Sequence, residues 1–188
     1  MKEFNLYPYT ISRYEAVGRY VSLSGVYHDN GWKVASDKNI LVAIKAEYDE
    51  SLEQRIIRKD KTEVMGTFPK WRKIIPTRSD LSHYNKVKLT KEMLSNIENW
   101  YESIKEGLKA DKTRYKVRIG DCYYQAPLFK KYYEAIRYYG ISTLWVDPLR
   151  AAYGKNSECI TLLMPLIYTD AEKKWVNEHL NVLNLLNE

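Results

Sequence analysis

Apolar and polar residues alternate over much of residues 20–48, a pattern typical of strands with one buried face. Asn30-Gly31 interrupts the alternation, and this pair favours a hairpin turn because both residues accept positive φ values at little cost. The second interruption, Ser36–Asn39, is entirely polar, and Asp and Asn side chains stabilise turns by bonding to the nearby backbone. We therefore predict strands over 20–28, 32–36 and 40–48.

Three later stretches repeat their apolar residues at the spacing of a helix. The first covers 90–109, with Thr90 as its N-cap, and the second opens at Pro127 and ends at Gly140. The third begins at the capping box Thr169–Glu172. Its inward face is expected at Trp175, His179, Leu180, Leu183 and Leu186. A short helix is also predicted over residues 10–20.

Most of the remaining chain has the pattern of antiparallel strands, which indicates an α+β fold rather than a parallel, doubly wound one. Residues 66–76, GTFPKWRKIIP, contain two prolines and predict an extended connector between two similar halves. We expect one domain over 1–168, with halves at about 1–76 and 77–168, and then a separate amphipathic helix over 169–188. The other predicted strands cover 114–126, 142–147 and 159–168. Residues 150–158 are expected to hold a short strand and the turn Gly154-Lys155-Asn156, and a charged hairpin is predicted over 51–63.

Composition narrows the class of protein without fixing its function. Of the 188 residues 45% are hydrophobic and 29% charged, as in a globular protein. The net charge of +6 fits a nucleic acid partner and equally a mildly basic protein without one. The N-terminus lacks the apolar run of a signal peptide, and no apolar run approaches membrane-spanning length. With two cysteines that lack metal-binding spacing, these features predict a cytoplasmic protein with free thiols.

The sequence contains no P-loop, GxGxxG, GxSxG or HExxH motif. His28, His83 and His179 lie far apart, and isolated histidines are more often structural than catalytic. The carboxylates of residues 47–50, EYDE, fit a solvated strand end better than a metal site. We therefore expect no cofactor, no metal and no enzymatic activity, with a site invisible in sequence as the rival hypothesis.

Three segments in the same chain order resemble the bacterial replicative sliding clamp, the β subunit of DNA polymerase III. Residues 25–43 resemble the clamp segment in which a strand and turn lead into an Ala-Thr-Asp-Gly-His-Arg-Leu-Ala motif. Here the motif falls at residues 35–42, with Lys38, Asn39 and Ile40 in place of Gly-His-Arg. The connector 66–76 resembles the clamp's Gly-x-Phe-Pro linker, and residues 128–166 resemble its last helix and strands, which end in Met-Pro-Met. Together these segments cover a little over a third of the chain.

The resemblance implies a DNA-clamp-like fold of two βαβββ-type half-modules with antiparallel sheets, plus the extra C-terminal helix. It implies a non-catalytic protein with double-stranded DNA, replication or repair proteins and further copies of itself as partners, and no membrane. A clamp subunit has three such domains, whereas this chain has room for one. Ring closure is therefore in doubt, and a clamp-fold interaction module without DNA binding is an alternative.

The resemblance also implies a groove for short hydrophobic peptides, with the polar turn 36–39 at its rim. Since Leu41 and Leu166 also suit a core, and the turn also suits a plain hairpin, both interpretations remain open. The residues at the matching positions are Ser36, Asp37, Asn39, Leu41, Pro76, Met164, Pro165 and Leu166.

The helix that the resemblance places on DNA is 127–139, where Lys130, Lys131 and Arg137 would meet phosphates. These cations span more than one helix face, so a solvated surface explains them equally well. For the C-terminal helix two hypotheses compete: it covers the groove of its own chain, or it pairs with another subunit.

Overall fold

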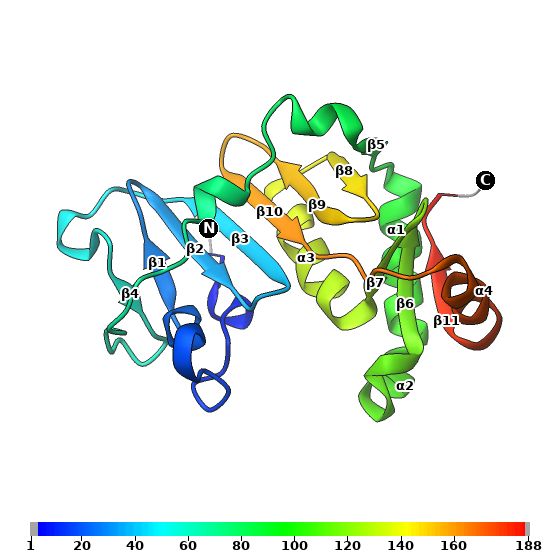
Figure 1. The fold of residues 1–188 in the computed structure, drawn as a ribbon, viewed down its shortest axis with the longest axis horizontal. Coiled ribbons are helices and arrows are strands. Elements are labelled where there is room, and N and C mark those ends of the chain that lie inside the picture. The colour runs from blue at the N-terminus through cyan, green and yellow to red at the C-terminus, as the bar shows by residue number, and fades with distance from the viewer. Residues whose placement is uncertain (1–3, 187–188) are drawn as a thin grey trace.

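In the computed structural model, residues 4–186 are described, and their strands form a large sheet of eight strands and a small sheet of three. The order in the large sheet is β4-β1-β2-β3-β10-β9-β8-β5, and all its pairs are antiparallel (Figure 1). Its strands are β1 (Val26–His28), β2 (Trp32–Ser36), β3 (Ile40–Lys45), β4 (Ile56–Ile57), β5 (Asn85–Lys88), β8 (Thr143–Asp147), β9 (Arg150–Lys155) and β10 (Cys159–Leu163). The α+β prediction is confirmed.

The two halves of the chain meet where β3 pairs with β10, from Ile40↔Leu163 to Ile44↔Cys159. On either side of this seam lies a three-stranded meander, β1-β2-β3 and β8-β9-β10. The two meanders have the same strand arrangement on the two sides of the seam, but the helices that precede them differ. Among the described residues, α3 (Ala126–Tyr139) precedes the second meander, whereas a 3-10 helix, Gly18–Leu23, precedes the first. Two equivalent βαβββ half-modules are therefore not confirmed, and the helix predicted over 10–20 is wrong.

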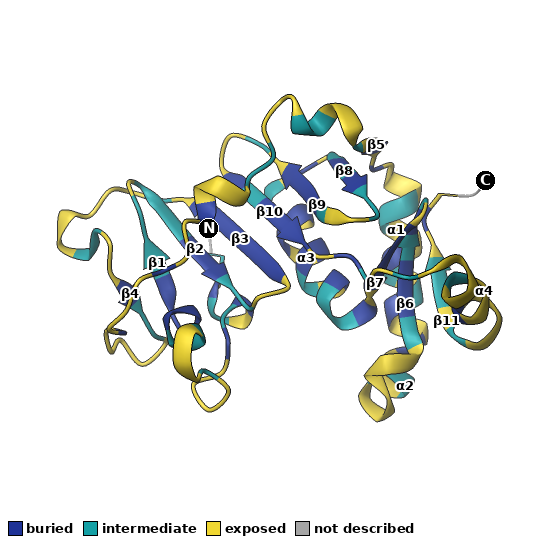
Figure 2. Cartoon of the chain, viewed as in Figure 1, coloured by how far each residue is buried: buried dark blue, intermediate teal, exposed yellow. Residues whose placement is uncertain are grey.

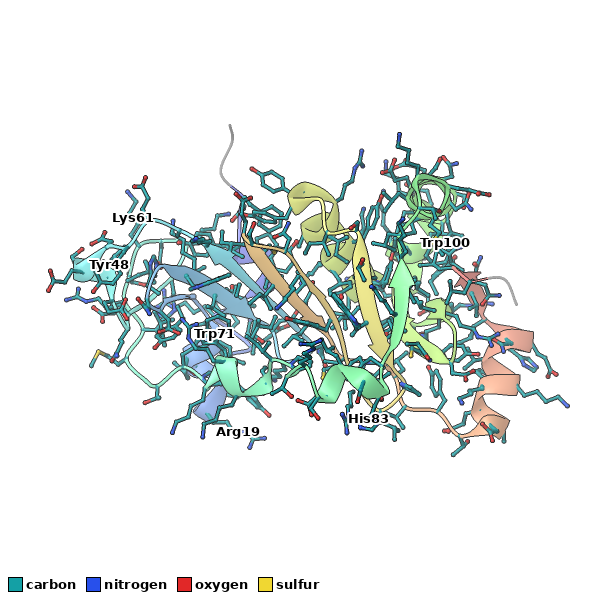
Figure 3. The ribbon with its side chains drawn as sticks, turned by 90° about the horizontal axis from the view of Figure 1, so that it is seen from above. Arg19, Tyr48, Lys61, Trp71, His83 and Trp100 are labelled. Atoms are coloured by element: carbon teal, nitrogen blue, oxygen red, sulfur yellow. The ribbon has the colours of Figure 1, made fainter. Side chains whose placement is uncertain are left out.

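Helix α3 and the connector cover opposite faces of the large sheet. Side chains facing α3, such as Ile40 and Leu163, belong to the main core, which extends over α1 (Lys91–Ser103) to the small sheet. Side chains on the other face, such as Leu41 and Leu162, form a second core with residues of the connector. We call these the helix face and the outer face; Figure 3 shows the connector and α3 on opposite sides. Most residues of the two central strands, β3 and β10, are buried (Figure 2).

The connector 66–76 is anchored to the outer face by an indole hydrogen bond. Trp71 is 2% exposed and donates from Nε1 to Asp29 Oδ2 at 2.6 Å, and Arg72 Nε lies 3.0 Å from the same oxygen. Residues Trp71–Ile74 form a 3-10 turn within the otherwise extended segment. The connector therefore covers the second core and also joins the two halves of the chain.

The predicted turns and helix caps are confirmed for the central part of the chain. Asn30 and Gly31 have φ values of 47° and 72°, as the hairpin turn requires. Thr90 accepts a hydrogen bond from Met93 N and caps α1, and Gly140, with φ of 64°, ends α3. The helix predicted over 90–109 divides at Ile104, after which α2 (Lys105–Ala110) begins.

The predicted C-terminal helix is shorter than expected. The capping box Thr169/Glu172 is present, but α4 (Asp170–His179) ends at His179. The chain then forms β11 (Asn181–Asn184), which pairs in parallel with β6 (Tyr115–Ile119), and β7 (Cys122–Gln125) completes the small sheet. The inward face was also misassigned, because Trp175 is 53% exposed and Val176 is buried. None of the helices within residues 4–186 has the length and apolar character needed to cross a bilayer.

Candidate functional site

The polar segment Ser36–Asn39 is a tight turn whose side chains bond their own backbone. Ser36 Oγ donates to Ile40 O at 2.9 Å, and Asp37 Oδ1 accepts the N–H groups of Asn39 and Ile40 at 3.2 and 3.1 Å. Lys38 sits at the tip with φ of 81°, a left-handed conformation that is uncommon for a residue with a Cβ atom. The polar residues are therefore explained locally as the closure of the β2-β3 hairpin.

The end of β10 lies directly beside this turn, although more than 120 residues separate the two in sequence. Met164 N donates to Asn39 O at 2.8 Å, which extends the β3-β10 pairing by one step. The structure thus places seven of the eight residues at the groove positions on two segments, 36–41 and 164–166, which meet where Met164 bonds to Asn39. We call this region the β3–β10 junction; its members are Ser36, Asp37, Asn39, Leu41, Met164, Pro165 and Leu166.

Only part of the β3–β10 junction is open to solvent. Leu41 is 4% exposed and belongs to the outer-face core, and Pro165 is also buried. Met164 is 46% exposed and is the large apolar side chain that the junction presents to solvent. Leu166 is half-buried, and its N–H donates to Tyr123 O at 2.7 Å, which ties the chain to the small sheet.

Pro76, the eighth residue, lies on the connector. Its neighbour Ile75 packs against the outer-face core that contains Leu41 and Leu162. Pro76 itself is half-buried. The connector thus reaches the outer-face core beneath the junction, and it covers apolar residues that would otherwise form an open floor.

Two cations flank Tyr20 at the outer face. Lys38 Nζ lies 3.8 Å from the centre of the Tyr20 ring, and Arg19 Nη2 donates to Tyr20 Oη at 2.8 Å. The hydrogen bond from Arg19 lowers the pKa of the phenol below its usual value. Arg19 and Tyr20 were not predicted from the sequence, because a Tyr next to an Arg forms no periodic pattern or motif. Lys38 was not predicted either, although it lies between the predicted site residues Asp37 and Asn39.

The predicted DNA-binding cations of α3 have partners within the protein. Lys131 Nζ lies 3.3 Å from Asp37 Oδ2, and the Asp37 side chain is 14% exposed. Arg137 Nη1 lies 2.6 Å from Glu98 Oε1. Lys130 is exposed, with Nζ 5.8 Å from the centre of the Tyr101 ring. Two of the three cations therefore join α3 to the rest of the fold.

A hollow of about 810 Å³ lies on the helix face of β1–β3, where the first half lacks an α-helix. Phe4, His28, Lys33 and Glu158 are among its lining residues, and burial, followed by the charge of Lys33, lowers the pKa of His28. None of the predicted site residues lines this hollow. Within the described part of the chain, no group of three or more His, Cys, Asp or Glu side chains could hold a metal ion.

Comparison with solved structures gives matches to bacterial β sliding clamps. The β clamp of C. crescentus superposes with a TM-score of 0.55 at 13% identity, over 79% of this chain and 59% of the clamp chain. The DnaN clamp of Bartonella birtlesii, bound to griselimycin, gives 0.53 at 12% identity, over 78% and 59%. The chain has a sliding-clamp-like fold. The Helicobacter pylori β clamp bound to a DNA ligase peptide gives 0.53 at 14% identity, over 87% and 61%.

This sliding-clamp-like chain matches only between 59% and 61% of the length of those three clamps. No protein-family model matches it, and no curated protein matches its sequence. At 12% to 14% identity the likeness concerns the fold, so the activity and partners of the clamps do not transfer automatically.

Proposed function

We propose that this protein is a non-catalytic, clamp-fold module that binds short peptide segments of other proteins at the β3–β10 junction. The observation that carries the proposal is the meeting of the Ser36–Asn39 turn with the exposed Met164 across the seam between the halves. An apolar anchor beside a polar rim is the usual anatomy of a peptide site, and methionine adapts to varied ligands. The H. pylori clamp, which has a similar fold, was solved bound to a DNA ligase peptide, and this supports a peptide-binding role. The proposed partners are replication or repair proteins of a bacterial cytoplasm.

Direct DNA binding through α3 is the weaker candidate. Lys131 and Arg137 are engaged by Asp37 and Glu98, so phosphates would have to compete with these carboxylates. A single exposed lysine, Lys130, gives little of the charge neutralisation on which nonspecific DNA affinity depends. These ion pairs favour the alternative of a clamp-fold module that binds proteins without binding DNA. Whether several copies assemble into a ring is a separate question of oligomeric state.

The proposal is tested by selecting ligands from a displayed library of random seven-residue peptides and then measuring their binding to variants of the full chain. Met164→Arg places a charge at the exposed anchor, and we expect at least tenfold weaker binding of the selected peptides. Met65→Arg is the matched control, because Met65 is 85% exposed and lies outside the junction.

Two results would contradict the proposed function. One is a selection that enriches no peptide family with the wild-type chain. The other is a set of peptides whose affinity for Met164→Arg equals that for Met65→Arg, with both variants folded by circular dichroism.

A further inference from the structure

Arg19, Tyr20 and Lys38 form a compact cationic cluster, which we call the Tyr20 cluster. Lys38 approaches the ring face at 3.8 Å, while the Arg19 guanidinium carbon lies 4.9 Å from the ring centre and its Nη2 donates to the phenol oxygen. Arg19 and Lys38 are exposed, and Figure 3 shows Arg19 on the side of the sheet opposite α3. One aromatic ring thus gathers two positive charges at the surface.

The positive charge of the Tyr20 cluster is not neutralised by the fold. Within residues 4–186, no carboxylate lies within ion-pair distance of Arg19 or Lys38. Asp37 is adjacent to Lys38 in sequence, but its Oδ2 faces Lys131 and its Oδ1 accepts two backbone N–H groups. Gathering two cations without an anion is electrostatically unfavourable, and charge-assisted hydrogen bonds donated by these cations to an anionic ligand would relieve it.

The Tyr20 cluster is continuous with the proposed peptide site. Tyr20 packs against the outer-face core that contains Leu41 and Leu162, and Lys38 belongs to the Ser36–Asn39 turn itself. Met164 lies two residues after Leu162 along an extended chain, so the two side chains point to the same face, the outer face of the sheet. A peptide segment that contacts Met164 would therefore place its neighbouring residues near the two cations.

We propose that the Tyr20 cluster is an anion subsite that selects peptides carrying an Asp or Glu side chain beside their apolar anchor. The inference rests on the proposed function, since it names the chemical class of the partner segment. The carboxylate would accept from the Arg19 guanidinium and the Lys38 ammonium group, while the Tyr20 ring holds both cations in place. The geometry thus assigns to Lys38, at the tip of the turn, a role in specificity.

The test reverses the charges of Arg19 and Lys38 and compares the peptides that the wild-type and variant chains select from the library. With the wild-type chain, we expect Asp and Glu to be enriched at one position next to the apolar residues. With Arg19→Glu/Lys38→Glu, we expect that enrichment to disappear and Lys or Arg to replace it. Lys38→Glu makes the same demand on the backbone as lysine does, because both carry a Cβ atom at φ of 81°. Lys155→Glu is the control, since Lys155 is exposed at the opposite end of the β9-β10 pair.

A second variant keeps the inference testable if the protein with both charge reversals does not fold. Lys38→Gly removes the ammonium group and suits the left-handed backbone. Selected acidic peptides should bind it about threefold to fivefold more weakly at low salt, with the difference shrinking at high salt. Their amidated and free C-terminal forms should bind alike, because the side-chain carboxylate is the recognised group.

The outcomes separate this inference from the proposed function. Enriched apolar peptides with no acidic position, or acidic peptides whose selection survives charge reversal, overturn the anion subsite and leave the peptide site standing. A requirement for a free C-terminus also overturns it, as does charge reversal that weakens binding to a short DNA duplex but not peptide selection. No enrichment of any peptide overturns both.

Discussion

At the scale of single residues, Asp37 connects the two faces of the molecule. Its Oδ1 closes the Ser36–Asn39 turn on the proposed site, and its Oδ2 pairs with Lys131 of α3 on the other side of the sheet. A largely buried carboxylate loses much of its hydration, so its paired cation and its N–H donors together offset that cost. The turn is therefore held in place by the helix as well as by its own backbone.

Replacing Lys131 with Met keeps the volume of the side chain and removes the cation from Asp37. We expect the free energy of unfolding to fall by about 1 kcal/mol, as for a partly exposed ion pair. Urea unfolding measures the change. Lys130→Met is the matched control and should change stability by less than about 0.5 kcal/mol, because Lys130 is exposed. Equal effects of the two substitutions would show that the Asp37 contact contributes nothing.

The buried thiols predict a loss of stability at high pH. Burial raises the pKa of Cys122 from 9.0 to about 11 and that of Cys159 from 9.0 to about 12. Above pH 9 the unfolded chain loses thiol protons while the folded chain retains them, so the folded state loses stability as pH rises. We expect each thiol to reduce the free energy of unfolding by about 1 kcal/mol between pH 9 and pH 10.

Urea unfolding at the two pH values measures this loss, and Cys122→Ala/Cys159→Ala isolates it from the buried tyrosines. The double variant should lose about 2 kcal/mol less than the wild-type chain over the same interval. An identical pH dependence of the two proteins would contradict the assignment of the loss to the thiols.

At the scale of elements, α4 and β11 form an addition to the small sheet. β11 pairs with β6 in parallel, Tyr123 donates from its hydroxyl to Asn177 Oδ1 on α4, and Trp100 Nε1 donates to Asn181 Oδ1. These contacts attach the segment to β6, β7 and α1 of its own chain. Leu183 and Leu185 of this segment pack on the main core of the same chain, whereas Trp175 is exposed.

The capping box makes the contribution of α4 measurable. Thr169 Oγ1 accepts from Glu172 N, and the Glu172 carboxylate accepts from Thr169 N. Thr169→Ala should lower the free energy of unfolding by about 1 kcal/mol, because it leaves an N-terminal N–H of the helix without a partner. Thr169→Ser preserves the oxygen and should stay within a few tenths of a kcal/mol of the wild type. A neutral Thr169→Ala would mean that α4 is not coupled to global unfolding.

The elements that sequence could predict were those determined by local chemistry. Asn30-Gly31, Thr90 and Gly140 each fixed a turn or a helix end, because the conformations they favour depend on few neighbours. The prediction of a helix beyond His179 was wrong for residues 180–186. Leu183 and Leu186 fit a helical stripe in the sequence, but pairing with the open edge of β6 decides the outcome. Sequence also gave no sign that Ile104 divides the long helix.

At the scale of the whole molecule, the seam between β3 and β10 decides both the fold and the candidate site. Resemblance of the Ser36–Asn39 and Met164–Leu166 segments to a clamp predicted their proximity, and the hydrogen bond from Met164 N to Asn39 O confirms it. Periodicity alone could not have done so, since register between distant strands is set by tertiary packing. The Tyr20 cluster was not predicted at all, for the same reason.

The clamp-like fold is asymmetric about the same seam. One meander is backed by α3, and the other by the N-terminal segment and the hollow near His28. The β3–β10 junction lies on the outer face, whereas this hollow lies on the helix face. The proposed function requires the first, while the rival hypothesis of an unrecognised enzyme would use the second.

The most direct test is an amide chemical-shift titration of the full chain with a peptide selected from the random library. We predict that the largest shifts fall at Ser36–Leu41, at Met164–Leu166 and around Tyr20, in residues contributed by both halves of the chain. Shifts confined to the hollow of Phe4, His28 and Glu158 would contradict the account and favour a different site.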